Sequence, residues 1–214
     1  MDGEGVLAHR FELRTRGHAE GLMPMLEAVM AEARLGFADL DALAVTIGPG
    51  TFTGLRVGLA AARGLALARA LPLVGVTTLE AVAAPVTAAG EAIAVAFDAR
   101  RGEIYLQIFD ATHAALTAPM IVALAEARAY LPAGAVVGVG SGATLLADVL
   151  APHGVKVRLS AAPAQPDAIA IARIATARLA MEGADRFRVA PAPLYLRAPD
   201  AKLPGGLDPV AGAA

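Results

Sequence analysis

A glycine-rich loop is the segment whose residue types point most directly to chemistry in this 214-residue sequence. It reads GPGTFTG from Gly48 to Gly54, between apolar runs that predict a strand over 42–47 and a helix over 55–69. Glycines let backbone N–H groups converge, and a helix N-terminus adds positive potential, so the loop is suited to hold a phosphate. The candidate anion-binding residues are Gly48, Gly50, Thr51, Thr53 and Gly54. The spacing matches neither the P-loop nor G-x-G-x-x-G, so a tight structural turn is the alternative.

Side chains suited to acid–base, nucleophilic or metal chemistry are scattered along the chain. The four histidines, at positions 9, 18, 113 and 153, include no pair four residues apart, as a helical metal site would need. Asp98 and Glu103 flank a predicted hairpin, and we expect them to cap it rather than to share a proton. Ser141 stands between two glycines without the pattern of a nucleophile elbow, which favours a strand-to-helix turn. The sequence therefore predicts no catalytic residue and no metal ligand.

The composition excludes several classes of protein. Hydrophobic residues make up 57% of the chain and charged residues 18%, which is too apolar for a disordered protein. The absence of cysteine excludes a disulfide scaffold and a thiol enzyme, and the net charge of −2 argues against a dedicated polyanion binder. The uncharged stretch 129–147 is broken by Pro132 and several glycines, and the N-terminus lacks the apolar core of a signal peptide. We therefore expect a cytoplasmic protein that does not associate with membranes.

Two predicted helices carry unusual apolar faces. The helix expected over 17–34 has an apolar stripe at helical spacing, and two further methionines lie away from that stripe. In the helix over 55–69, small residues recur every four positions at Gly54, Gly58 and Ala62, which lets another helix approach closely. Burial in the core of this chain and a surface that faces a partner are the two interpretations of both faces.

The order of predicted elements indicates two α/β lobes, with a first lobe over 1–90 and a second over 91–197. A strand is expected over 6–13, after a turn at 3–5. The second lobe opens with a hairpin, whose strands alternate from Ala92 to Asp98 and from Ile104 to Ile108, and contains further strands and helices. The tail 198–214 is expected to join the first lobe.

Four blocks of sequence resemble the TsaB family, also called YeaZ. They are Thr46 to Ala83, Arg16 to Leu26, Asp98 to Tyr105 and Pro193 to Arg197. The resemblance spans nearly the whole chain. It implies a two-lobed α/β fold of the actin/Hsp70 type (the ASKHA superfamily). It also implies a role in making N6-threonylcarbamoyladenosine at position 37 of tRNA.

The resemblance further implies a non-catalytic subunit that binds a TsaD-type catalytic partner, with a TsaE-type ATPase as a third component and a homodimer as an alternative assembly. ATP, ADP and metal are then expected on the partners, this chain needs no cofactor, and tRNA is met only through the complex. A metal site of the catalytic type needs paired histidines, whereas here Leu22 stands four residues after His18. The implied partner interface consists of His18, Leu22, Met25, Leu26, Val29, Gly54, Leu55, Gly58, Leu59 and Ala62.

One departure from the family pattern concerns the start of the chain. TsaB-like proteins begin with a strand carrying an Asp-Thr/Ser motif and then a second strand, so the first lobe is expected to lack its N-terminal strands here. A form extended upstream is expected to be more stable, since strands pair backbone groups that are otherwise left open. The alternatives to the subunit role are a stand-alone nucleotide-binding enzyme of the same superfamily, using Gly48 to Gly54 and Asp98, and an M22-type glycopeptidase.

Overall fold

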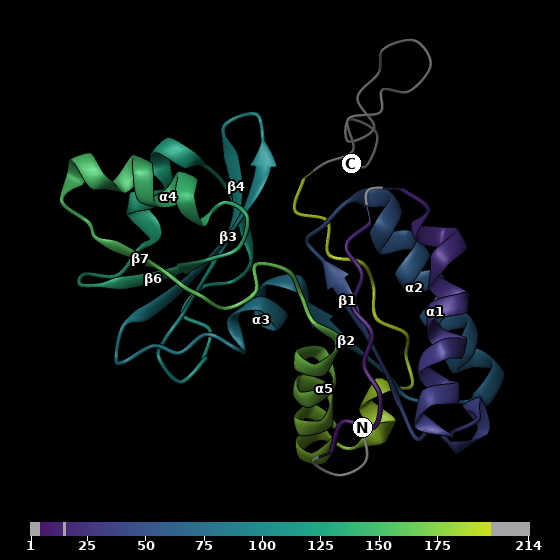
Figure 1. The fold of residues 1–214 in the computed structure, drawn as a ribbon. Helices are drawn as coiled ribbons and strands as arrows, with labels where there is room; N and C mark the ends of the chain where they lie inside the picture. The colour runs from purple at the N-terminus through teal and green to yellow at the C-terminus, as the bar shows by residue number, and fades with distance from the viewer. Residues whose placement is uncertain (1–4, 15, 198–214) are drawn as a thin grey trace, which may run out of the picture.

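The computed structural model describes residues 5–14 and 16–197, which form two groups of helices and strands, each around its own sheet (Figure 1). The elements of the first half are α1 (His18–Ala33), β1 (Leu43–Gly48), α2 (Phe52–Arg69), β2 (Leu73–Thr77) and α3 (Thr78–Ala83). Those of the second half are β3 (Ala92–Arg100), β4 (Glu103–Phe109), β5 (Met120–Ala123), β6 (Val136–Val139), α4 (Ala143–Leu150), β7 (Val157–Leu159) and α5 (Ala168–Glu182). Short 3₁₀ helices occupy Phe37–Asp39, Leu124–Tyr130, Ala151–His153 and Ala184–Phe187.

The larger sheet has five strands in the order β5-β4-β3-β6-β7. Strands β3 and β4 form the antiparallel hairpin expected from the alternating sequence, and β6 and β7 add to β3 in parallel. Both faces of this sheet are buried. In β3, Ala94 and Ala96 contribute to one apolar cluster, with α4, while Ile93 and Val95 contribute to the opposite cluster, with α3. Full burial of such valine and isoleucine side chains contributes roughly 1.5–3 kcal/mol each, so these two clusters stabilise the second half.

The smaller sheet pairs β1 with β2 in parallel. Helix α2 covers it on one side, and α5 packs against both strands and against α3. A cluster of Val74, Val76, Ala81 and Ala175 forms the centre of this contact. The sequence expectation assigned 91–197 as a whole to the second lobe, and for α5 this is corrected. An amphipathic helix settles where its apolar face is buried, and the partners of that face are β1 and β2.

Helix ends follow local side-chain chemistry. Thr51 caps α2, since its hydroxyl accepts a hydrogen bond from the N–H of Gly54 at 3.3 Å. Thr77 and Glu80 form a reciprocal capping box at the start of α3, as their spacing of three residues indicates. Asp167 caps α5 by accepting from the N–H of Ile169 at 2.8 Å. The threonine caps prevent fraying where β1 and β2 turn into helices.

Two expectations about local structure were wrong. Residues 6–13 form no strand, and the interactions found for this segment are made by side chains: His9 contacts Asp167 at 2.8 Å and Arg10 pairs with Glu32 at 2.7 Å. A strand needs a neighbouring strand to satisfy its backbone, and the smaller sheet contains only β1 and β2 in the described residues. At the β3–β4 tip, Arg100 and Arg101 adopt positive φ together with Gly102, although only the glycine was expected to. Residues 3 and 4 of the expected turn and the tail 198–214 lie outside the described residues.

Candidate functional site

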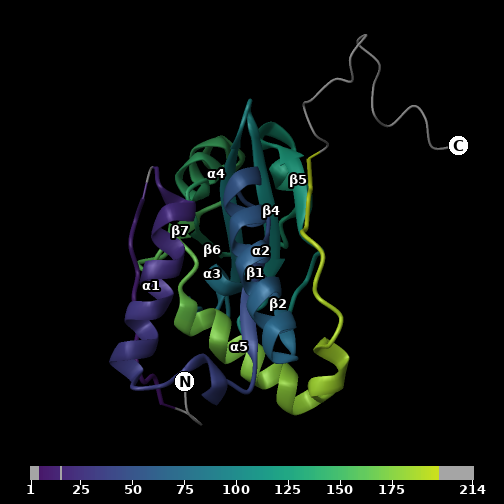
Figure 2. The same cartoon turned by 90° about the vertical axis from the view of Figure 1, so that its right-hand side faces the viewer.

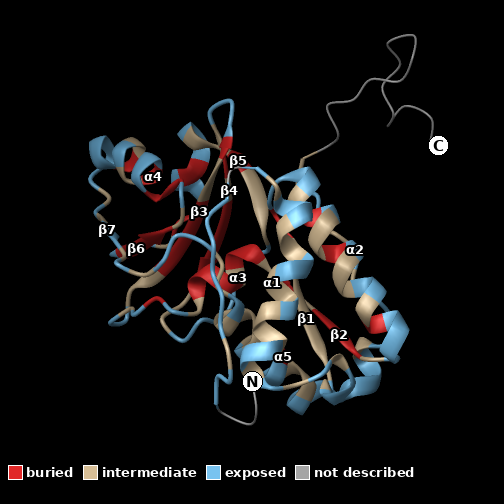
Figure 3. Cartoon of the chain, turned by 45° about the vertical axis from the view of Figure 1, so that its right-hand side comes forward, coloured by how far each residue is buried: buried red, intermediate tan, exposed pale blue. Residues whose placement is uncertain are grey.

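Helix α1 carries an apolar stripe that its own chain buries only in part. None of its residues is buried, although it contains leucine, methionine and valine side chains along most of its length (Figure 3). Of the implied interface residues, Leu22, Met25, Leu26 and Val29 are half-buried and His18 is exposed. Met23 lies away from that stripe and is 40% exposed. An apolar helix without a buried residue in a folded chain is typical of a surface that another molecule covers.

Helix α2 divides the implied interface residues into two groups. Leu55 and Leu59 are only 7% and 3% exposed, so they belong to the core of this chain, and their contact with a partner stays a prediction. They lie on the helix face that packs on the smaller sheet, where apolar burial is satisfied internally. Gly54, Gly58 and Ala62 are half-buried, and a Cβ added at Gly58 would lie 4.0 Å from Val45 Cγ2. That is an ordinary van der Waals distance, so packing among the described residues does not require a glycine at position 58.

The glycine-rich loop is shaped by contacts within the chain. Gly48 has a φ of 113°, and a Cβ there would meet the carbonyl oxygen of Leu194 at 2.8 Å. The N–H of Leu194 donates to the carbonyl of Ile47 at 2.7 Å, which holds the C-terminal segment against the loop. The hydroxyl of Thr51 accepts a hydrogen bond from the N–H of Gly54, as described above. Gly48, Thr51 and Gly54 thus have structural roles, and the anion site stays a prediction.

A second glycine-containing turn connects β6 to α4 and packs against β3. It consists of Gly140, Ser141 and Gly142. A Cβ at Gly140, whose φ is 100°, would lie 2.3 Å from the carbonyl oxygen of Ala96. The N–H of Gly142 donates to that same oxygen at 2.9 Å, and the hydroxyl of Ser141 accepts from the N–H of Asp98 at 3.2 Å. The expected strand-to-helix turn is confirmed. The hydroxyl of Ser141 has a structural role, because it bonds the backbone of β3.

The carboxylates of the hairpin are engaged by arginines. Asp98 accepts from the N–H of Arg100 at 2.8 Å and pairs with its guanidinium at 3.3 Å. Glu103 is ion-paired with Arg197, which ties the C-terminal segment to the second lobe. Capping and flanking roles for Asp98 and Glu103 are therefore confirmed.

Two carboxylates elsewhere have altered acidity. The hydrogen bond from Arg158, together with its charge, holds the pKa of Glu91 below its ordinary value. The hydroxyl of Thr112 donates to Asp110 at 2.7 Å, and with the N–H of Ala114 it lowers the pKa of Asp110. Because both pKa values lie below those of the unfolded chain, these contacts stabilise the fold at neutral pH. That stabilisation is lost as the pH falls through the folded-state pKa.

Arg178 connects three elements at the junction of the lobes and was not singled out by the sequence. From α5 it donates to the carbonyl of Gly75 in β2 at 2.7 Å and to Glu80 of α3 at 2.5 Å. Gly75 is also a site of close approach, because a Cβ there would lie 2.8 Å from both Ile47 Cγ2 and Pro191 Cβ. Arg178 therefore satisfies a backbone acceptor at the outer edge of β2 and neutralises Glu80.

Replacement of Arg178 with methionine is expected to lower the free energy of unfolding by about 2 kcal/mol, because a partly buried carboxylate and a carbonyl each lose a charged donor. Denaturant unfolding of the full chain measures this change. Arg186→Met is the matched control, since Arg186 is 75% exposed and its nearest carboxylate, Glu182, is 3.9 Å away. The control should stay within about 0.5 kcal/mol. Equal losses in the two variants would contradict the role of Arg178.

Within residues 5–14 and 16–197, no group of three or more histidine, cysteine, aspartate or glutamate side chains lies close enough to hold a metal ion. Within the same ranges, no helix has both the length and the apolar content needed to cross a membrane.

Comparison with known proteins agrees with this architecture. The family model described as "TsaD: tRNA N6-adenosine threonylcarbamoyltransferase" matches residues 6–202. The Escherichia coli protein named "tRNA threonylcarbamoyladenosine biosynthesis protein TsaB" is 39% identical over 104 residues, which are 48% of this chain and 45% of that protein. A "tRNA N6-adenosine threonylcarbamoyltransferase" of Erythrobacter litoralis is 51% identical over 69 residues, 32% of this chain and 20% of that protein. The chain thus spans less than half the length of these curated relatives.

Solved structures extend the likeness over most of the chain. A crystal structure from Pseudomonas aeruginosa, titled as an uncharacterized protein with similarity to peptidase YEAZ, superposes with a TM-score of 0.73 and 26% identity, covering 88% of both chains. A structure titled "YeaZ from Pseudomonas aeruginosa" gives a TM-score of 0.70 and 25% identity, covering 87% of this chain and 88% of the other.

The chain therefore belongs to the tRNA N6-adenosine threonylcarbamoyltransferase family, on a match that runs through both lobes. Within that family, the named relatives and the two solved structures place it with the TsaB (YeaZ) proteins. The α/β fold of actin/Hsp70 type that the sequence implies is confirmed by these structures.

Proposed function

We propose that this protein is a non-catalytic subunit in the synthesis of N6-threonylcarbamoyladenosine on tRNA. It binds and supports a TsaD-type catalytic subunit in the cytoplasm, with a TsaE-type ATPase as the third component. The family match and the TsaB-named relatives support the pathway. In this proposal ATP and metal are bound by the partner subunits, and this chain requires no cofactor of its own.

The observation that carries the proposal is the apolar surface of α1, where sixteen residues include none that is buried. Figure 2 shows α1 along one side of α2, at the edge of the molecule, where a second protein has access. Methionine side chains adapt to irregular contacts, which suits a docking surface. Among the implied interface residues, His18, Leu22, Met25, Leu26 and Val29 form the α1 part, and Gly54, Gly58 and Ala62 border it on α2.

The experiment that tests the proposal combines the full chain with the catalytic subunit from the same genome. We expect the two proteins to elute together in size-exclusion chromatography. We also expect tRNA modification, measured by mass spectrometry of nucleosides, to require this chain in a reaction that also contains the ATPase. Full modification without this chain would contradict the proposal.

Replacing Met23 with glutamate tests the docking surface directly. Met23 is exposed, so the fold should be preserved, while a charge buried against an apolar partner should weaken the complex by at least about ten-fold in Kd. Met181→Glu is the matched control, because Met181 is 84% exposed on α5, outside the proposed surface. Isothermal titration against the catalytic subunit measures both variants. Wild-type affinity in Met23→Glu would remove the exposed face of α1, on which Met23 lies, from the interface.

The nucleotide-binding enzyme is less well supported as an alternative. Its loop residues Gly48, Thr51 and Gly54 are engaged in packing and capping, and Asp98 is paired with Arg100. ATP hydrolysis by the isolated chain, lost on Asp98→Asn, would favour that alternative over the subunit role.

A further inference from the structure

An exposed cluster of aromatic and arginine side chains lies on α2, on the side away from α1. Figure 2 shows α2 between α1 on one side and the C-terminal segment 188–197 on the other. The cluster, called here the aromatic–arginine patch, lies where that segment meets α2. It consists of Phe52, Arg56, Arg63 and Tyr195.

The two aromatic rings of the patch are exposed to solvent and contact each other. Phe52 is 50% exposed and Tyr195 is 44% exposed, in a chain where aromatic residues are only 4% of the total. Their centroids lie 5.7 Å apart with an interplanar angle of 34°. Two exposed rings in contact form a continuous apolar surface, which is the kind of surface feature that a ligand covers.

Arg56 is stacked on the patch and held there. Its guanidinium carbon lies 3.6 Å from the centroid of the Phe52 ring, and its Nε donates to the hydroxyl of Tyr195 at 3.3 Å. Phe52 and Arg56 are four positions apart on the same face of α2. The guanidinium is thus a flat, preorganised plane beside an exposed tyrosine ring, which is the geometry on which an unpaired nucleobase stacks.

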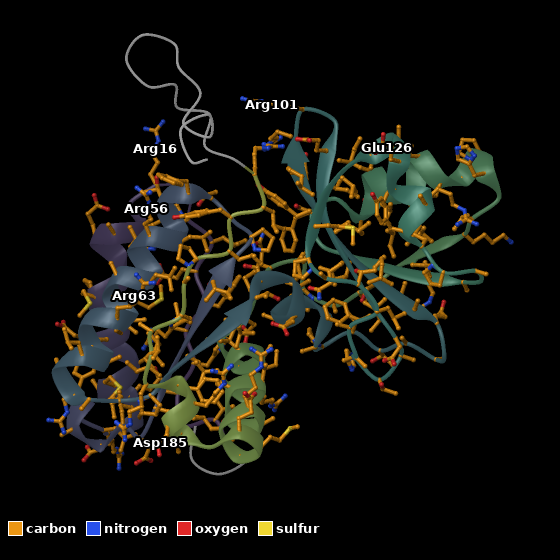
Figure 4. All side chains as sticks on the ribbon, turned by 180° about the vertical axis from the view of Figure 1, so that it is seen from behind. Arg16, Arg56, Arg63, Arg101, Glu126 and Asp185 are labelled. Carbon is orange, nitrogen blue, oxygen red and sulfur yellow. The ribbon has the colours of Figure 1, made fainter. Side chains whose placement is uncertain are left out.

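The positive charge of the patch is not neutralised by a carboxylate in the described residues. The ion pairs found there include neither Arg56 nor Arg63, and Arg63 donates instead to the carbonyl of Pro191. Their separation of seven positions corresponds to roughly 10 Å along the helix. Figure 4 shows Arg63 and Arg56 following one another along α2.

From this geometry we infer that the aromatic–arginine patch binds an unpaired segment of RNA. One base stacks on Tyr195 and the Arg56 guanidinium, and Arg56 and Arg63 contact backbone phosphates on either side of it. Uncompensated cations along a track favour a polyanion over a protein partner, whose apolar contacts are better met by α1. The inference goes beyond the proposed function, because the binding belongs to this chain alone and is measured without the catalytic subunit.

Titration of a labelled ten-nucleotide oligoadenylate RNA with the full chain, followed by fluorescence anisotropy, tests the inference. We expect the single strand to bind and a duplex RNA of equal length to bind at least ten-fold more weakly, because its bases are not available for stacking. Phe52→Ala and Tyr195→Ala should each weaken binding by roughly ten-fold, and Tyr195→Phe, which keeps the ring, should retain most of the affinity. Arg63→Gln should reduce the slope of log affinity against log salt by about 0.7, the loss of one phosphate contact.

Phe11→Ala and Arg186→Gln are the matched controls, since Phe11 is 47% exposed and Arg186 is 75% exposed, both outside the patch. They should bind like the wild type, and thermal unfolding should show all variants folded. Three results would overturn the inference: no binding of the single strand at low salt, equal binding of duplex, or equal losses in patch and control variants. If Phe52→Ala no longer bound the catalytic subunit but bound RNA as the wild type does, the patch would be assigned to a protein partner instead.

Discussion

Replacing Gly140 with alanine is expected to destabilise the protein by at least about 3 kcal/mol. Two penalties combine at this residue. Its φ of 100° is strained for any residue with a Cβ, and the added Cβ would lie 2.3 Å from the carbonyl oxygen of Ala96. That oxygen belongs to a central strand and already accepts the N–H of Gly142, so it cannot move without breaking the turn. Denaturant unfolding measures the loss, and a reduced yield of folded protein is expected beside it.

Gly134→Ala is the matched control for this substitution. Gly134 has a similar φ of 107°, but nothing lies within 4 Å of the position that its Cβ would occupy. It should therefore show the backbone penalty alone, about 1–2 kcal/mol. If both variants lost the same stability, the close approach to Ala96 would not be what requires glycine at position 140.

Truncating Leu79 to alanine is expected to cost about 3 kcal/mol, within the range found for buried leucines. Leu79 is 0% exposed and belongs to a cluster with Val82, Ile93, Val95 and Phe109. Its helix, α3, contacts strands of both sheets and lies between them in Figure 1. A cavity there weakens the junction of the lobes as well as one core, so hydrogen exchange should rise in both halves.

Leu67→Ala provides the corresponding control on α2. Leu67 is 85% exposed, so its truncation should change the free energy of unfolding by no more than about 0.5 kcal/mol. Increased exchange confined to the second half in Leu79→Ala would show that α3 does not couple the two sheets.

Local patterns predicted most elements correctly. The expected helix over 17–34 is α1, the strand over 42–47 is β1, and the alternating hairpin is β3 and β4. These succeed because periodicity and capping act over a few residues. The strand expected over 6–13 failed because apolar residues near the ends of a segment do not supply the neighbouring strand that pairs with it. The assignment of α5 to the second lobe failed because sequence order does not determine which sheet buries a helix.

One of the two candidate surfaces could be predicted from the sequence, and the other could not. The apolar surface of α1 was suggested by leucines and methionines at helical spacing, whereas burial of Leu55 and Leu59 became evident only in the packed structure. The aromatic–arginine patch could not be found from sequence. Phe52 and Arg56 are separated from Tyr195 by about two thirds of the chain, and they meet through the path of the C-terminal segment.

The sequence by itself determined the class of fold, the position of its helices and turns, and the family, because each depends on short-range spacing or on contiguous blocks of residues. Only the tertiary structure decided which apolar faces are core and which remain open, and which glycines are required by a close approach. Those properties depend on contacts between residues far apart in the chain, such as Gly140 with Ala96 and Arg178 with Gly75. Their energies come from packing and desolvation, which no local pattern contains.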